Sequence, residues 1–180
     1  MFIEQPPLLY RILFPEAVWR IKRKKRKVVY LTFDDGPIPE VTPWVLDLLD
    51  YYGIKATFFL VGDNVKRNPH LLEEIKKRGH SWGNHTMNHP MCHLTGLGTD
   101  DIRSQIDDAT NAIKDIAGQA PQVLRPVGGG VNSDVKAVAA ELGYPLGGEL
   151  VGTMGGERDR GYRCLQLVRH VVDKVVFHLG

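Results

Sequence analysis

Two neighbouring aspartates follow an apolar segment near the start of the chain. The segment Val28–Leu31 has the composition of a β-strand, and Asp34 and Asp35 follow it in the run Thr-Phe-Asp-Asp-Gly-Pro. Neighbouring side chains of a strand point to opposite faces, so both carboxylates can serve one site only where the pleat breaks. The loop that begins at Gly36 and Pro37 is expected to break it. A strand-ending turn without chemistry is the alternative interpretation.

Two histidines further along the chain, His85 and His89, are spaced i and i+4. That spacing places both imidazoles on the same side of a helical turn or a tight loop, as in other motifs that hold a divalent metal ion. Two imidazoles and one carboxylate leave metal positions open, as a hydrolase or a non-haem iron oxygenase requires. Cys92 and Cys164 have no zinc-finger spacing, which disfavours a structural zinc site. We expect free thiols, with a disulfide as the alternative.

Strand-like and helix-like segments alternate along the chain and predict an α/β fold with a parallel sheet, either an open doubly wound sheet or a barrel. Both architectures gather residues at the carboxyl ends of their strands, where the aspartates, the histidines and Arg125 fall. Strands are expected over residues 28–33, 56–61, 80–84, 122–124 and 175–177. Helices are expected from an N-cap at Thr42 to Gly53, from a cap at Asn68 and Pro69 to Gly79, and over 99–117 and 133–142.

The spaced motifs resemble those of the polysaccharide deacetylases of carbohydrate esterase family 4, the NodB homology domain. The resemblance rests on the aspartate run at 32–37, on Ala-Thr-Phe-Phe at 56–59 with Val61 and Gly62, and on the segment from Gly79 to His89. It implies an irregular (β/α) barrel. It also implies that Asp34 is the catalytic base and that Asp35, His85 and His89 hold the metal ion.

Arg125 and Pro126 begin like the family's Arg-Pro-Pro-Tyr-Gly motif, which implies that Arg125 orients the base. The chain continues with Val127 and three glycines, so Gly129 matches but the second proline and the aromatic residue are absent. A backbone N–H at Gly128 can still donate to an oxyanion, although the glycines lose packing and order. A phosphate-binding loop is the alternative, but no Lys-Ser or Lys-Thr follows.

The C-terminal segment matches the family less closely. His178 fits the late Leu-x-His motif, with Val176 in place of leucine, and the resemblance implies that it is the acid that protonates the departing amine. A surface histidine is the alternative. Glu149, Glu157 and Asp159 are candidates for a further family acid, but no aromatic residue accompanies them. Family members continue further past this histidine, so we expect a barrel that is incomplete at its C-terminal end.

Composition indicates an ordinary globular protein. The 180 residues are 43% hydrophobic and 24% charged, and we expect an N-terminal extension over 1–27 and a polysaccharide deacetylase-like domain over 28–180. The net charge of +2 favours no particular partner. No apolar run is long enough to span a bilayer, and the N-terminus lacks the order of a signal peptide. The sequence therefore predicts a cytoplasmic protein, either free or peripheral to the inner membrane.

The basic run Arg20–Lys27 is the strongest charge cluster in the sequence. Aromatic residues are absent from it, which disfavours nucleic acid as a partner. Because the run directly precedes the first expected strand, we interpret it as a solvated collar. Docking on an anionic membrane surface is the alternative.

The sequence supports two functions of different classes. The first is a metal-dependent hydrolase of non-peptide C–N bonds that removes N-acetyl groups from a glycan of the peptidoglycan or chitin type. The second is a catalytically weak or silent homologue that binds a metal ion and a glycan, and the glycines after Arg125 favour it. Zinc (Zn) is the expected ion, with Co, Mn and Ni as alternatives.

Overall fold

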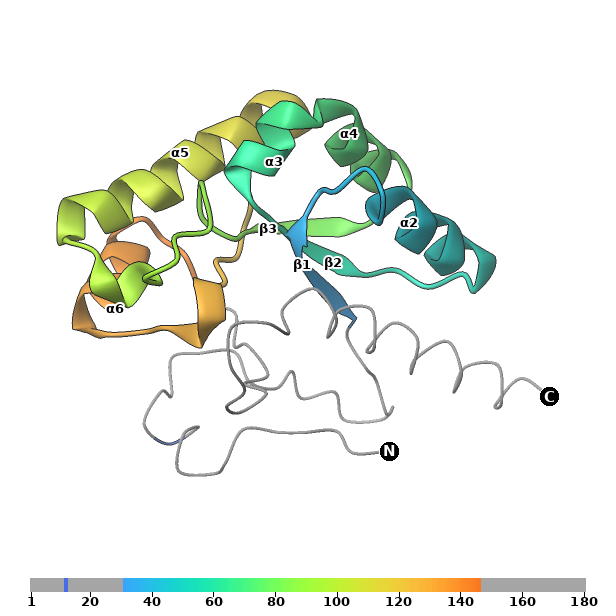
Figure 1. Ribbon diagram of the computed structural model, residues 1–180. Helices are drawn as coiled ribbons and strands as arrows, with labels where there is room; N and C mark the ends of the chain where they lie inside the picture. Colours follow the sequence, from blue (N-terminus) through green and yellow to red (C-terminus); the bar gives the residue numbers. More distant parts are fainter. Residues whose placement is uncertain (1–11, 13–30, 147–180) are drawn as a thin grey trace.

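The computed structural model describes residue 12 and residues 31–146. Within that part the chain forms three parallel strands and five α-helices (Figure 1). Several predictions concern residues outside the described part and stay predictions: the boundary at Val28, the basic run, the last strand at 175–177, His178, the three acidic candidates after residue 148, and Cys164.

The sheet has the order β1-β2-β3, with both pairs parallel. The strands expected at 56–61 and 80–84 are confirmed, whereas the first strand extends past its expected end at Phe33 and includes both aspartates. The described strands do not establish the expected barrel. The strands are β1 (Thr32–Gly36), β2 (Thr57–Leu60) and β3 (Ser81–Asn84).

The expected strand at 122–124 is wrong. Only Leu124 pairs there, through isolated parallel bridges to Asn84 on one side and Leu146 on the other. Pro121 and Pro126 flank this segment, and proline has no N–H to donate to a ladder, so pairing is limited to a single position. The bridges continue the direction of the sheet beyond β3 and place Arg125, the next residue, beside the end of that strand.

The helices agree with the expected segments, and one more is present. The additional helix, α3, is too short for its apolar periodicity to be recognised in the sequence. Thr42 is the first residue of α2 and not its cap, and its Oγ1 accepts a hydrogen bond from the Ile38 N–H at 2.8 Å. No helix in the described part is long and apolar enough to cross a membrane. The helices are α2 (Thr42–Tyr51), α3 (Gly62–Arg67), α4 (Pro69–Lys77), α5 (Thr99–Ala117) and α6 (Ser133–Glu141).

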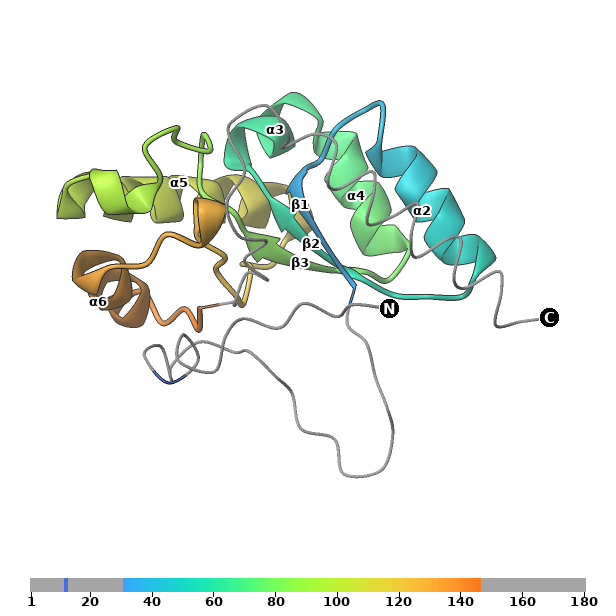
Figure 2. The ribbon, with the colours of Figure 1, turned by 60° about the horizontal axis from the view of Figure 1, so that its bottom comes forward.

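Helix α5 joins the two parts of the hydrophobic core. Its C-terminal half, with Ile113, packs into the core formed by the sheet with α2 and α4, and its N-terminal half, with Ile102 and Ile106, packs against α6 and Leu124. Figures 1 and 2 show α2, α3 and α4 on one side of the sheet, with α5 running from α4 towards α6. The apolar stripe predicted for residues 99–117 is therefore buried along the whole helix.

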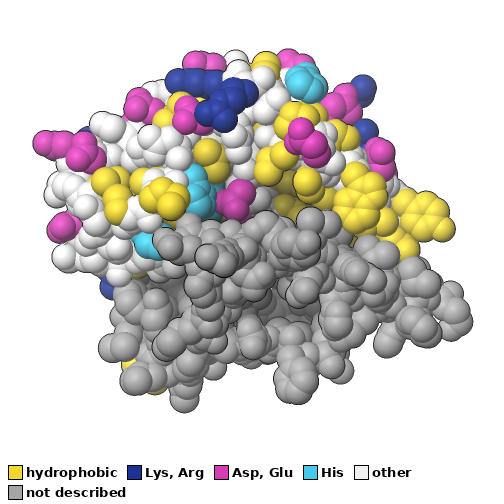
Figure 3. Space-filling view, viewed as in Figure 1, with side chains coloured by type: hydrophobic (Ala, Val, Ile, Leu, Met, Phe, Trp, Pro, Cys, Tyr) yellow, Lys and Arg dark blue, Asp and Glu magenta, His cyan; other side chains and the backbone are white. Residues whose placement is uncertain are grey.

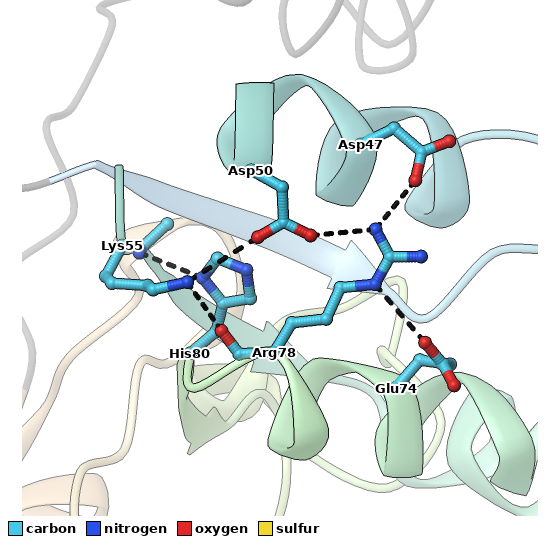
Figure 4. Close-up of polar contacts among 7 residues, drawn as sticks. Asp47, Asp50, Lys55, Glu74, Arg78 and His80 are labelled. Carbon is cyan, nitrogen blue, oxygen red and sulfur yellow. Dashed lines mark hydrogen bonds and ion pairs between the residues drawn. The ribbon is translucent and has the colours of Figure 1, made fainter. Parts of the chain in front are cut away.

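An arginine links α2 to the end of α4 (Figure 4). Arg78 Nη1 lies 2.6 Å from Asp47 Oδ1 and 3.0 Å from Asp50 Oδ2, and its Nε donates to Glu74 Oε2 at 3.2 Å. Exposed pairs of this kind each stabilise a fold by less than about 1 kcal/mol. The network lies near the amino end of β3, which leaves the carboxyl ends of the strands to other residues.

His80, next to this network, is buried at 4% exposure. Its Nδ1 accepts a hydrogen bond from the Ala56 N–H at 3.3 Å, and its Nε2 has no partner among the described residues. Figure 4 shows the His80 ring beside Lys55 and Arg78. Burial lowers the pKa of His80, and the positive charges of Lys55 and Arg78 lower it further. His80 is therefore a neutral structural histidine in the folded protein near neutral pH.

Candidate metal centre

A β-bulge in β1 places the two aspartates. The pairing of β1 with β2 shifts between Phe33 and Gly36, so that Asp34 and Asp35 lie opposite one residue, Phe59. A bulge re-aims the side chains that it contains. The break in the pleat that the sequence required is present, but it lies inside the strand and not in the loop that follows.

The backbone of Asp35 has a φ of 67°, in the left-handed region that non-glycine residues rarely adopt. The side chain of Asn64, on α3, donates from Nδ2 to the Asp35 carbonyl oxygen at 2.8 Å. This hydrogen bond ties the bulge to the helix that follows β2 and holds Asp35 in its unusual conformation.

The two histidines lie in a tight loop after β3, as the i, i+4 spacing predicted. Thr86 and His89 also have left-handed backbones, with φ of 69° and 51°. Asn84 Oδ1 accepts from the Thr86 N–H at 2.8 Å, and Thr86 Oγ1 accepts from the His89 N–H at 3.2 Å. Gln105 of α5 accepts from the next two backbone N–H groups after Thr86, each at 3.2 Å. Side chains of β3 and α5 therefore shape the loop.

Asp35, His85 and His89 converge on one point. Asp35 Oδ1 lies 3.3 Å from His85 Nε2 and 3.2 Å from His89 Nε2, and the three candidate ligand atoms all lie within 4.8 Å of one another. His85 Nδ1 lies 2.6 Å from the Arg125 carbonyl oxygen, which makes Nδ1 the donor and leaves the Nε2 lone pair for a metal ion. Two nitrogens and one oxygen fit a divalent ion with open positions.

One side of this cluster is open to solvent. The side chain of His85 is 3% exposed, whereas that of Asp35 is 46% exposed. Figure 3 shows histidine and acidic side chains together at the surface of one face, next to atoms that are not described. The sequence-predicted ligands are thus brought together, and their role as ligands stays a prediction.

Burial, hydrogen bonds and neighbouring charges shift the pKa values of Asp35 and His85 in opposite directions. Burial by itself raises the pKa of Asp35, but the hydrogen bonds from His85 and His89 outweigh it, and the pKa falls well below its usual range. Burial by itself lowers the pKa of His85, but without a metal ion the protonated ring donates from Nε2 to Asp35, and this bond and the charges of Asp34 and Asp35 raise the pKa above its ordinary value. A metal ion that binds Nε2 must displace this proton. The carboxylate of Asp35 is therefore ionised and available to a cation.

Arg125 holds the other aspartate. Its Nη1 donates to Asp34 Oδ1 at 2.7 Å and to Thr32 Oγ1 at 2.9 Å, and its guanidinium carbon lies 3.8 Å from the centre of the Phe59 ring. No hydrogen bond to Asp34 Oδ2 is found within residues 31–146. The structure thus brings the predicted base and its predicted orienting residue into contact, with one carboxylate oxygen left for other partners.

Two residues that shape the site were not identified in the sequence analysis. Asn64 follows the carboxyl end of β2 closely, a position that often carries functional residues in parallel sheets, and that position is the signal that identifies it. Gln105 is one polar residue among many on α5, and the sequence contains no signal for its role.

Comparison with known proteins agrees with this site. Residues 21–147 match the family model described as polysaccharide deacetylase. The peptidoglycan-N-acetylglucosamine deacetylase of Bacillus cereus is 40% identical over 128 residues, which are 71% of this chain and 58% of that protein.

Solved structures of the same family are also similar. The family 4 carbohydrate esterase from Streptomyces lividans in complex with acetate aligns with a TM-score of 0.62 at 35% identity, over 66% of this chain and 60% of that one. A CE4 family pseudoenzyme from Bacillus anthracis aligns with a TM-score of 0.63 at 28% identity, over 69% of this chain and 43% of that one. The chain spans less than two thirds of the length of these relatives. The family model covers more than half of the chain, and the chain belongs to the polysaccharide deacetylase family, carbohydrate esterase family 4.

Proposed function

We propose that this protein is a divalent-metal-dependent hydrolase that removes N-acetyl groups from an N-acetylated glycan. The observation that carries the proposal is the convergence of Asp35, His85 and His89 beside Asp34, which Arg125 holds. Similarity to a peptidoglycan-N-acetylglucosamine deacetylase favours peptidoglycan as the substrate, ahead of a chitin-type oligosaccharide.

Asp35, His85 and His89 would hold the ion. When bound, a divalent ion polarises the acetyl carbonyl and lowers the pKa of a water molecule. Nitrogen and oxygen donors in this number suit zinc first, with Co, Mn and Ni as alternatives. Because the Arg125 carbonyl oxygen keeps the proton on His85 Nδ1, the Nε2 atom is the one that would bind the ion, with release of the proton that it shares with Asp35.

Asp34 is the proposed base. Its Oδ1 is held by Arg125, and Oδ2 accepts the proton of the water that attacks the acetyl carbon. The oxyanion that forms is stabilised by the N–H of Gly128, in the loop that follows Arg125. His178, outside the described residues, is the proposed acid that protonates the glycan nitrogen as its bond to the acetyl carbon breaks, so that acetate and a free amine are released.

A silent metal- and glycan-binding homologue is the second candidate. The observation that favours it is the run of glycines at 128–130, which provides no side chain to pack beside the site. A pseudoenzyme among the similar structures shows that members of the family can lack activity.

Acetate release from N-acetylglucosamine oligomers and from peptidoglycan fragments separates the two candidates. We expect release that a chelator stops, that zinc restores and that Asp34→Asn lowers about 10²- to 10⁴-fold with zinc affinity unchanged. Asp108→Asn, which changes an exposed carboxyl group on α5, is the control and should leave release unchanged. Stoichiometric zinc binding without any release would favour the silent homologue, and release that survives chelation would refute the metal-dependent mechanism.

A further inference from the structure

Two loops leave the metal centre side by side. The first runs from His89 to a 3₁₀ turn at Leu94–Gly96, and the second runs from Arg125 through a 3₁₀ turn at Val127–Gly129. At the metal centre they are joined through the Arg125 carbonyl oxygen, which accepts a hydrogen bond from His85, four residues before the first loop begins.

The loops meet again where His93 lies against Gly128. A Cβ atom added to Gly128 would lie 2.5 Å from His93 Nδ1 and 3.3 Å from His93 Nε2. Real Cβ atoms essentially never approach other heavy atoms to less than 3.0 Å, so the distance to Nδ1 excludes a side chain unless the ring moves. The imidazole of His93 therefore fills the space that a side chain at position 128 would occupy.

This contact persists although its histidine is in an unfavourable conformation. His93 has a φ of 55°, in the left-handed region that non-glycine residues rarely adopt, whereas Gly128, with a φ of 60°, adopts it without strain. His93 Nδ1 is buried and has no hydrogen-bond partner among the described residues. Strained backbones and unpaired polar atoms are retained where the surroundings impose them, and they concentrate at functional sites.

Neighbouring residues anchor both loops. Leu94, directly after His93, is fully buried against α5, α6 and Leu124. Asn132 donates from Nδ2 to the Thr95 carbonyl oxygen at 3.5 Å, and the same Asn132 caps α6 through the Val135 N–H at 2.9 Å. The backbone next to His93 and the segment that follows the glycine loop are thus anchored, which limits how far the two loops can move apart.

We propose that His93 is a positioning residue that replaces, from the neighbouring loop, the side chain that position 128 lacks. The ring keeps the glycine loop at 128–130 packed beside the metal centre and holds the Gly128 N–H where the acetyl oxyanion forms. This proposal rests on the proposed deacetylase function for its catalytic part, but the contact itself can be tested without activity.

A double-mutant cycle tests the contact. Gly128→Ala should lower the equilibrium constant for folding about tenfold more than Gly53→Ala in urea unfolding, because overpacking adds to the shared cost of a left-handed alanine. Gly53 is the matched control, with a φ of 62° and no atom within 4 Å of its added Cβ. In a His93→Ala background the excess should disappear. An equal effect of Gly128→Ala in both backgrounds would overturn the proposal.

His93→Ala and His93→Phe test the positioning role. We expect His93→Ala to lower kcat about tenfold with KM and zinc affinity within about twofold of wild type, and His93→Phe to recover most of kcat because it keeps a ring against Gly128. An unchanged kcat in His93→Ala, or a parallel loss of zinc affinity, would overturn the role.

Affinity of the zinc-loaded proteins for acetohydroxamate separates a failure of this inference from a failure of the proposed function. The hydroxamate presents a carbonyl oxygen to the same donors, so His93→Ala should bind it about tenfold more weakly even if the wild type releases no acetate. Equal measurable affinity in wild type and His93→Ala would overturn the proposal. No binding by either protein would count against the proposed metal-dependent function, and the double-mutant cycle then decides whether the contact exists.

Discussion

Asn64→Ala removes the hydrogen bond that holds the candidate ligand Asp35 in its left-handed conformation. The bond from Asn64 Nδ2 to the Asp35 carbonyl oxygen is 2.8 Å long and partly buried, and Asp35 has a φ of 67°. A net hydrogen bond contributes about 0.5–1.5 kcal/mol, and a left-handed residue costs about 1–2 kcal/mol. The hydrogen bond and the backbone strain are of similar free energy, so the backbone of Asp35 should leave its left-handed conformation when the side-chain amide of Asn64 is removed.

Metal binding must then restore the bulge. If restoring the bulge weakens zinc binding by about 1–1.5 kcal/mol, the zinc Kd rises about 5- to 12-fold, because about 1.4 kcal/mol corresponds to a factor of ten. The free energy of unfolding should fall by less, because relaxation of Asp35 relieves its strain. Isothermal titration of zinc against a competing chelator measures the Kd, and urea unfolding of the metal-free protein measures the stability.

Asn68→Ala is the matched control for this prediction. Asn68 Nδ2 donates to the Asn64 carbonyl oxygen at 3.2 Å, a partly buried bond between a side chain and the backbone that does not involve Asp35. This variant should keep the zinc Kd within about twofold of wild type. A zinc Kd in Asn64→Ala that matches the Asn68→Ala value would refute the reasoning that α3 preorganises the bulge.

Three further predictions concern the site, the packing and the pH dependence. Arg125→Lys keeps the charge but loses the planar contacts to Asp34, Thr32 and Phe59, and kcat should fall about 10²-fold in steady-state kinetics. Zinc affinity should persist in a titration, because His85 contacts the backbone of Arg125. Gly62→Ala should lower the free energy of unfolding in urea by about 1–3 kcal/mol, because its Cβ would lie 3.0 Å from Ala109 Cα. Because the pKa of His80 is lowered in the folded state, the unfolded state binds its proton first, and stability should fall as the pH drops below about 6.5 by at most about 1.4 kcal/mol per pH unit in urea titrations.

Two of these predictions have a control variant in the chain. Gly98→Ala, with a φ of −70° and its added Cβ 3.9 Å from the nearest atom, Asp101 Oδ2, should cost less than Gly62→Ala. His80→Asn should flatten the acid dependence of stability, whereas His70→Asn, which changes an exposed histidine, should leave it unchanged. A loss of zinc affinity in Arg125→Lys equal to its loss of kcat would show that the arginine supports the fold of the site and not the base.

Local patterns were sufficient for much of the fold. The helix expected over 99–117 has those bounds in the structure, because its apolar stripe and the glycine that ends it are properties of neighbouring residues. The strands at β2 and β3 were recognised for the same reason. The pairing of Leu124 with Asn84 and Leu146 was not, since one bridged residue leaves no periodic signal.

The sequence by itself determined which chemical groups are available and near which strand ends they lie: two carboxylates after one apolar segment, two imidazoles after another and an arginine after a third. The tertiary structure decided how they meet. The bulge in β1 turns neighbouring aspartates towards one site, Asn64 and the Arg125 backbone orient the ligand atoms, and His93 fills the space beside Gly128. These contacts join segments far apart in the chain. Their geometry depends on strand register and on side chains that pack across elements, which no local pattern of residues contains.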